Sequence, residues 1–225
     1  MSAGHDHAHT FDGMNDDYKR RLIAVTAINI GMFVVEMTAG QLSGSQALKA
    51  DALDFFADGI TYALSFWAIG RPQLVRTGAA LLKGVSLFAM GVWIAATTLY
   101  QFFVFGIPTA EVMGAIGFAA LAANLLSVYL LMAYKDGDAN IRSVWLCSRN
   151  DAIGNVAVMV AAGFVAVLNS GAPDLVVAGV MAALFLSSSY QILRHSWAEW
   201  QHEREHKGHE HGPEDHDHAH DEEDH

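Results

Sequence analysis

Long apolar stretches, separated by short polar ones, dominate the middle of this 225-residue chain. A helix needs roughly 20 mostly apolar residues to cross a hydrocarbon layer of about 30 Å. Six segments approach or meet that length, which predicts an all-α membrane protein with six transmembrane helices in a bundle. The predicted spans are Leu22–Leu42, Ala47–Gly70, Leu74–Phe103, Glu111–Ala133, Arg142–Leu168 and Asp174–Leu193. Pro72, Pro108 and Pro173 fall between them, where a missing backbone N–H leaves no helix unsatisfied.

Composition supports a lipid environment for this middle region. Hydrophobic residues make up 52% of the chain and charged residues 16%, and the mean hydropathy is +0.24, which is too apolar for an ordinary soluble domain. The formal net charge of -11 comes mostly from the two ends of the chain. The N-terminal residues are polar and acidic, so we expect no cleavable signal peptide. The single cysteine excludes an intramolecular disulfide.

The charge pattern predicts the domain organisation and the orientation. Residues 1–18 and 195–225 are predicted to be disordered His/Asp/Glu-rich tails around a transmembrane domain of residues 19–194. Lysine and arginine gather on the side of the bundle that carries both tails, which predicts that both termini are cytoplasmic. The tail histidines could capture metal ions, and the alternative is a solvated charged tail. They are His5, His7, His9, His209, His211, His216, His218 and His220.

Acidic residues cluster in the second predicted span. Asp54 and Asp58 are four residues apart, so they project from one helical face about 6 Å apart, and Asp51 lies one turn earlier on nearly that face. A carboxylate at membrane depth costs on the order of 3 kcal/mol, so the cluster should face a cavity. Because adjacent carboxylates repel, a divalent cation that replaces their protons is favoured. The alternative is a set of protonated aspartates that hydrogen-bond between helices.

The fifth predicted span carries a second polar stripe, since Cys147, Asp151 and Asn155 recur at helical spacing. Together with the aspartates of the second span, these side chains could close a four-donor metal site. Carboxylate oxygen combined with thiolate sulfur suits zinc or cadmium better than magnesium or calcium. The alternative for Cys147 is a small packing residue, in which case Asn150 or Asn155 completes the ligand shell.

The predicted membrane region contains no histidine between Thr10 and Arg194, so a metal site there must use other ligands. Glu36 and Asn29 are seven residues apart on one face of the first span, and we interpret them as lining the approach to the site. An intramembrane hydrolase is disfavoured because the predicted membrane region has no HExxH motif and no nucleophile elbow. We therefore expect no enzymatic activity, no cofactor and no nucleic-acid partner.

These residues resemble the cation diffusion facilitator family. The stretch Glu36–Leu48 (EMTAGQLSGSQAL), followed by Ala50–Ala52 and the pair Asp54 and Asp58, is similar to the family's signature across its first two spans. The resemblance implies a six-span, dimeric transporter that exports divalent metal ions in exchange for protons. It also implies that Asp54, Asp58 and Asp151 are metal ligands.

Two features depart from the family pattern. The family usually carries His-x-x-x-Asp on the fifth span, where this chain has Cys147 and Asp151, which leaves the fourth ligand and the metal preference open. The family usually adds a cytoplasmic ferredoxin-like domain, whereas about 30 polar residues follow His195 here. We therefore expect small residues of the membrane helices and the tails to hold the homodimer. The small residues are Ala79, Ala80 and Gly84.

The sequence thus predicts a divalent metal exporter in a bacterial inner membrane. Zinc is the expected substrate, cadmium and cobalt are further ones, and the expected mechanism is metal/proton antiport. The alternative is a membrane metal sensor or receptor without net transport.

Overall fold

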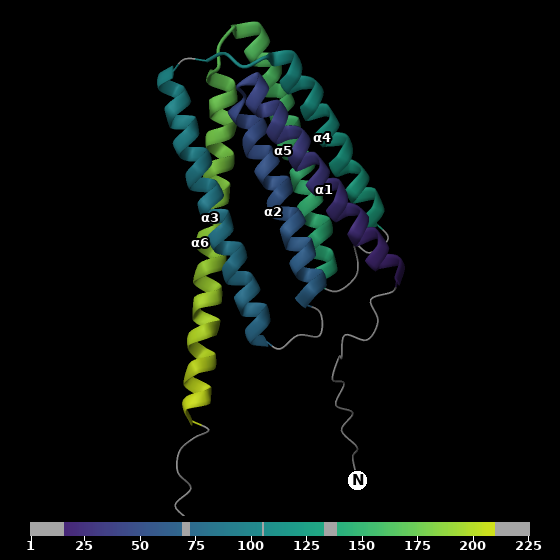
Figure 1. The fold of residues 1–225 in the computed structure, drawn as a ribbon, viewed down its shortest axis with the longest axis vertical. Coiled ribbons are helices and arrows are strands. Elements are labelled where there is room, and N and C mark those ends of the chain that lie inside the picture. The colour runs from purple at the N-terminus through teal and green to yellow at the C-terminus, as the bar shows by residue number, and fades with distance from the viewer. Residues whose placement is uncertain (1–15, 69–72, 105, 133–138, 210–225) are drawn as a thin grey trace, which may run out of the picture.

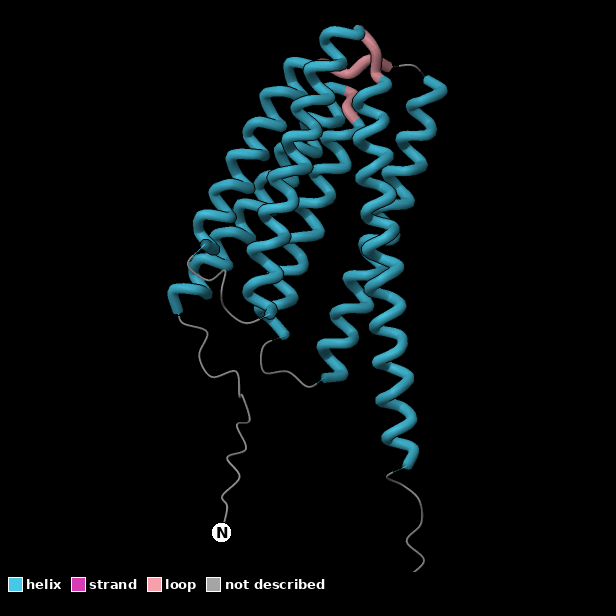
Figure 2. The backbone as a smooth tube through the Cα atoms, turned by 180° about the vertical axis from the view of Figure 1, so that it is seen from behind, coloured by secondary structure: helices cyan, strands magenta, loops and turns pink. Residues whose placement is uncertain are grey.

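The computed structural model describes residues 16–68, 73–104, 106–132 and 139–209; for residues 16, 65–68, 73–77, 139–150 and 199–209 it describes the backbone alone. Every element in these ranges is a helix, and the helices run side by side as one elongated bundle (Figures 1 and 2). The predicted all-α class is confirmed. The helices are α1 (Asp16–Ser43), α2 (Gln46–Ala68), α3 (Gln73–Val104), α4 (Ala110–Leu131), α5 (Ala139–Leu168) and α6 (Ala172–His209).

Five of the described helices are long and apolar enough to cross a membrane, judged by length and composition. Their qualifying segments are Asp17–Ser43, Gly78–Val104, Ala110–Leu131, Asp151–Leu168 and Ala172–Ala198. The segment from α2 is absent from this set because Lys49 and three aspartates interrupt its apolar sequence. The sixth span thus remains a prediction.

Two helices extend well beyond their predicted spans, whereas the ends of the other four lie within a few residues of the prediction. α1 begins at Asp16 instead of Leu22, and α6 continues to His209 instead of ending near Leu193. The added part of α6 is rich in Glu, Gln, Arg and Lys, which favour helix without needing a lipid environment. The predicted disordered C-terminal tail therefore begins inside a helix, while residues 1–15 and 210–225 lie outside the described residues. Pro173 also lies inside α6, in its first turn, where a helix does not use that N–H.

The helices form two groups, which Figure 1 shows side by side. The first group contains α1, α2, α4 and α5, and the second is the pair of α3 and α6, which pack together along most of their length. Two glycines make the close packing of this pair possible. A Cβ atom at Gly84 would come within 2.8 Å of Leu193, and one at Gly91 within 2.9 Å of Leu186. α2 also contacts both α3 and α6, so it joins the two groups.

Both ends of the described chain lie at one end of the bundle, which is the lower end in Figure 1. We call this the terminal end. The opposite end, called the turn end, carries the α1–α2, α3–α4 and α5–α6 connections. Gly44 forms the first of these turns at a φ of 75°, a conformation that favours glycine. Gly171 lies so close to the carbonyl oxygen of Gly106 that a Cβ atom would be 2.6 Å from it. The connections at the turn end are therefore tightly packed.

Candidate metal site

Carboxyl groups from α2 and α5 meet inside the bundle. Asp54 and Asp58 project from one face of α2, and the Asp151 carboxyl group lies within hydrogen-bonding reach of both. Helical spacing grouped Asp54 with Asp58, and the family resemblance implied that Asp151 joins them; the structure brings the three together. Whether they bind a metal stays a prediction.

A buried tyrosine supports this group. Tyr62 is only 1% exposed, and its hydroxyl donates a hydrogen bond of 2.6 Å to Oδ2 of Asp58. Tyr62 was not among the residues predicted from the sequence, although its position four residues after Asp58 on α2 places both on one helical face. A hydrogen bond of this kind fixes the orientation of the carboxyl group.

A cavity of about 370 Å³ lies beside these carboxyl groups, between α2 and the α3–α6 pair. Asp54 and Asp58 line it from α2, and Lys83 lines it from α3. Lys83 interacts electrostatically with Asp54. At about 30 Å³ per water, the cavity has room for roughly ten water molecules, or for a cation with part of its hydration shell. The remaining lining residues are Ala57, Leu87, Met181, Leu184, Phe185, Ser188, Gln191 and Ile192.

Asp51 faces a different partner. Its carboxyl group interacts with that of Glu36 on α1, and both residues are buried, at 1% and 0% exposure. Among the described residues, both Glu36 carboxyl oxygens and Oδ2 of Asp51 are buried without a hydrogen-bond partner of good geometry. Two such carboxyl groups cannot both be ionised without a neutralising proton or cation. The predicted acidic cluster on α2 is thus divided between two neighbouring sites.

The other predicted site residues differ in their burial and hydrogen bonding. Asn29 is buried but donates its amide N–H to the carbonyl of Val25 on its own helix, at 2.8 Å. Asn155 is fully buried, and its amide atoms have no hydrogen-bond partner within the described ranges. The side chains of Cys147, Asn150 and all the predicted tail histidines lie outside the described residues.

The described side chains do not form a closed metal site. No three His, Cys, Asp or Glu side chains among them are arranged to hold a metal ion. The Asp151 carboxyl group instead lies within hydrogen-bonding reach of Asp54 and Asp58. Metal binding would require them to open around the ion and a further donor to join them.

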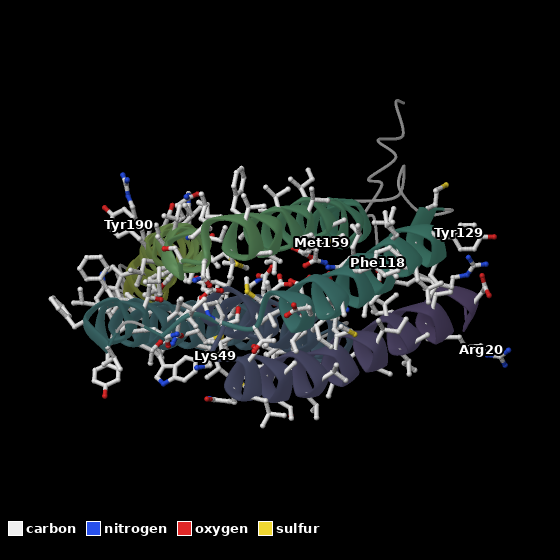
Figure 3. All side chains as sticks on the ribbon, turned by 90° about the horizontal axis from the view of Figure 1, so that it is seen from above. Arg20, Lys49, Phe118, Tyr129, Met159 and Tyr190 are labelled. Atoms are coloured by element: carbon white, nitrogen blue, oxygen red, sulfur yellow. The ribbon has the colours of Figure 1, made fainter. Side chains whose placement is uncertain are left out.

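Polar atoms gather between the helices, whereas the side chains around the outside are mostly carbon (Figure 3). Tyr129 and Tyr190 lie at the periphery in this view, and these two residues and Phe118 are 62–68% exposed. Large aliphatic residues are also exposed, including Leu42 at 85% and Val167 at 82%. A bundle that is polar inside and apolar outside suits a hydrocarbon solvent and not water.

Comparison with known families identifies the bundle. The model of the cation efflux transmembrane domain matches residues 22–199, which include parts of all six described helices. The chain belongs to the cation diffusion facilitator family. This membership and the apolar helices together make it an integral membrane protein.

Within this cation diffusion facilitator family, the chain is similar to several curated bacterial proteins. It is 28% identical over 206 residues to the zinc transporter ZitB of Escherichia coli K12, an alignment that covers 85% of this chain and 66% of ZitB. ZitB of Yersinia pestis is 28% identical over 203 residues, covering 82% and 63% of the two chains. The cadmium, cobalt and zinc/H(+)-K(+) antiporter of Bacillus subtilis is 24% identical over 210 residues, covering 86% and 65%. The chain thus spans just under two thirds of the length of these relatives.

Proposed function

We propose that this family member is a secondary transporter that exports divalent metal ions, with zinc as its main substrate and cadmium or cobalt as further ones. The contact of Asp54, Asp58 and Asp151 beside a cavity carries the proposal. Carboxyl groups inside a membrane bundle are costly and therefore mark an ion path. The names of the relatives, a zinc transporter and an antiporter for cadmium, cobalt and zinc, support the same class of substrate.

The three aspartates are the proposed metal ligands. Zinc prefers four donors in a tetrahedron, so one more donor is needed. Cys147 is one helical turn before Asp151 on α5 and would supply a thiolate, while Asn150 and Asn155 are the alternative donors. Tyr62 would hold the Asp58 carboxylate in position while its second oxygen faces the ion.

Proton exchange follows from the same contacts. Without a metal ion, three adjacent carboxyl groups retain protons because their negative charges repel one another. A divalent ion that enters from the cytoplasm displaces those protons, and protons from the opposite side would later displace the ion. This cycle is metal/proton antiport, and Lys83 beside Asp54 would keep the site from holding the ion too tightly.

The proposed topology completes this picture. We infer that α2 crosses the bilayer as a sixth span, because Asp51 and Asp58 are buried inside the bundle and not exposed to lipid. Both termini would then be cytoplasmic, in a bacterial inner membrane. The His-rich tails would capture metal ions for the site, and two chains would form a homodimer.

Transport by the purified chain in proteoliposomes tests this function. We expect uptake of labelled zinc when the lumen is acidic, with release of lumenal protons that a trapped pH dye reports. Exchange of external labelled zinc for lumenal unlabelled zinc separates transport from sensing, since a sensor binds zinc without such exchange. A Cys147→Ser variant should change the ratio of cadmium to zinc transport if sulfur is a ligand. Absence of both uptake and exchange would refute the proposed function.

A further inference from the structure

The α1–α2 turn is held by hydrogen bonds from α6. Asp174, in the first turn of α6, is fully buried. It accepts a hydrogen bond of 2.6 Å from the Ser45 hydroxyl, and bonds of 2.8 and 3.0 Å from the backbone N–H groups of Gln46 and Ala47. These donors belong to the start of α2, so Asp174 caps a helix that lies more than 120 residues earlier in the chain.

The same turn is held by α3. Gln101, in the last turn of α3, donates its amide N–H to the carbonyl of Gly44 at 2.6 Å. Its amide oxygen accepts a hydrogen bond, also of 2.6 Å, from the side chain of Gln46. We call residues 44–47, Gln101 and Asp174 the turn lock.

The hydrogen bonds of the turn lock join the two helix groups. Within the described ranges, the hydrogen bonds found between the α3–α6 pair and the other four helices all end on Asp174 or Gln101. Below the lock, the groups meet through apolar packing, in which Ala50 and Leu53 of α2 contact a cluster that includes Ala178 and Phe185 of α6. Among the side chains that the structure describes, the hydrogen bonds found between the groups thus lie at the turn end.

A cavity lies in the part of the interface that is nearer the terminal end. The cavity beside Asp54 extends along the α3–α6 pair as far as Lys83 and Ile192. Each lies roughly 20 residues from the turn end of its helix, a distance of about 30 Å at 1.5 Å per residue. The interface is therefore closed by hydrogen bonds at the turn end and opens into a cavity toward the terminal end.

We propose that the turn lock is the outer gate of the transporter. It stays closed while the carboxyl site is open to the cytoplasm, and it must release before the site can open to the other side. The inference rests on the proposed function, because it assumes transport and cytoplasmic termini. Water can replace each of these hydrogen bonds, since the first N–H groups of a helix and the Asp174 carboxylate are readily solvated when separated. The lock can therefore open and close without refolding.

A reversible cross-link tests whether the lock must open. Gln46→Cys/Gln101→Cys places thiols on two side chains that touch in the structure, and a short, reducible bifunctional thiol reagent joins them. We expect cross-linking to slow zinc uptake by about tenfold or more, with recovery on reduction. The single-cysteine variants, which keep native Cys147, control for the reagent. Full uptake by completely cross-linked protein would overturn the gate.

A labelling experiment tests the gate without relying on transport. Ala178 is fully buried beneath the lock, so a thiol from Ala178→Cys should react slowly with a membrane-impermeant maleimide added at the turn end. We expect Asp174→Asn or Gln101→Leu to speed that reaction by about tenfold, measured against the same variants without the Ala178 cysteine. Equal unfolding temperatures exclude general loosening. An unchanged reaction rate in both folded variants would refute the gate, whereas missing transport alone would refute only the proposed function.

Discussion

Tyr62→Phe is predicted to weaken metal binding while leaving the fold intact. The substitution removes one oxygen atom from a side chain that is 1% exposed, and with it the 2.6 Å hydrogen bond to Asp58. A hydrogen bond to a charged group contributes about 1.5–3 kcal/mol, which corresponds to roughly 10- to 150-fold in affinity. Residues that orient metal ligands typically change affinity by about 10–100-fold. We therefore expect zinc affinity to fall by about tenfold.

Zinc uptake into proteoliposomes over a range of zinc concentrations provides the assay. The apparent KM should rise by about tenfold, because Asp58 is less well held for the ion. The maximal rate should change much less, since the carboxyl ligands themselves remain. Tyr129→Phe is the matched control, because Tyr129 is 68% exposed on α4. A KM for Tyr62→Phe equal to that of the control would refute the proposed role of this hydrogen bond.

Three further predictions concern the remaining features. Glu36→Leu removes two buried oxygens that lack partners within the described chain. The free energy of unfolding, measured by heating in detergent, should rise by about 1–3 kcal/mol, and zinc uptake should be impaired. A loss of stability would contradict this prediction. Gly84→Leu should lower the unfolding temperature far more than Gly78→Leu, since Leu193 fills the space at Gly84 and nothing lies within 4 Å at Gly78. Equal effects would argue against tight α3–α6 packing. Deleting residues 210–225 should reduce uptake at low zinc concentrations only, and unchanged uptake there would remove the metal-capture role.

Much of the fold could be predicted from the sequence. Apolar length located all six helices, because a membrane bundle must satisfy its backbone hydrogen bonds within each helix. It failed at the ends of α1 and α6, where the helix continues into polar sequence that apolar length does not detect. Pro108 correctly marked the connection between α3 and α4. Pro173 did not mark a connection, because a proline is tolerated within the first turn of a helix such as α6.

Only part of the candidate site could be predicted from the sequence. Spacing within one helix predicts which residues share a face, so it grouped Asp54 with Asp58, while the family resemblance implied that Asp151 of α5 joins them. It does not give the register between helices, which decides that Asp51 meets Glu36. The cap that Asp174 provides for α2 depends on that same register, so the sequence predicted only that a span begins at Asp174. Contacts between distant helices require the three-dimensional structure.

The metal site itself is tested most directly by zinc uptake in Asp54→Asn, Asp58→Asn and Asp151→Asn variants. Each substitution keeps the size of the side chain and removes one carboxylate from the group beside the cavity. Asp17→Asn serves as the control, since Asp17 is an exposed residue at the start of α1 that pairs with Arg21. We predict that each of the three variants folds but loses zinc uptake by about 100-fold or more, while the control transports normally. Normal uptake by any one of the three would contradict the proposed three-aspartate site.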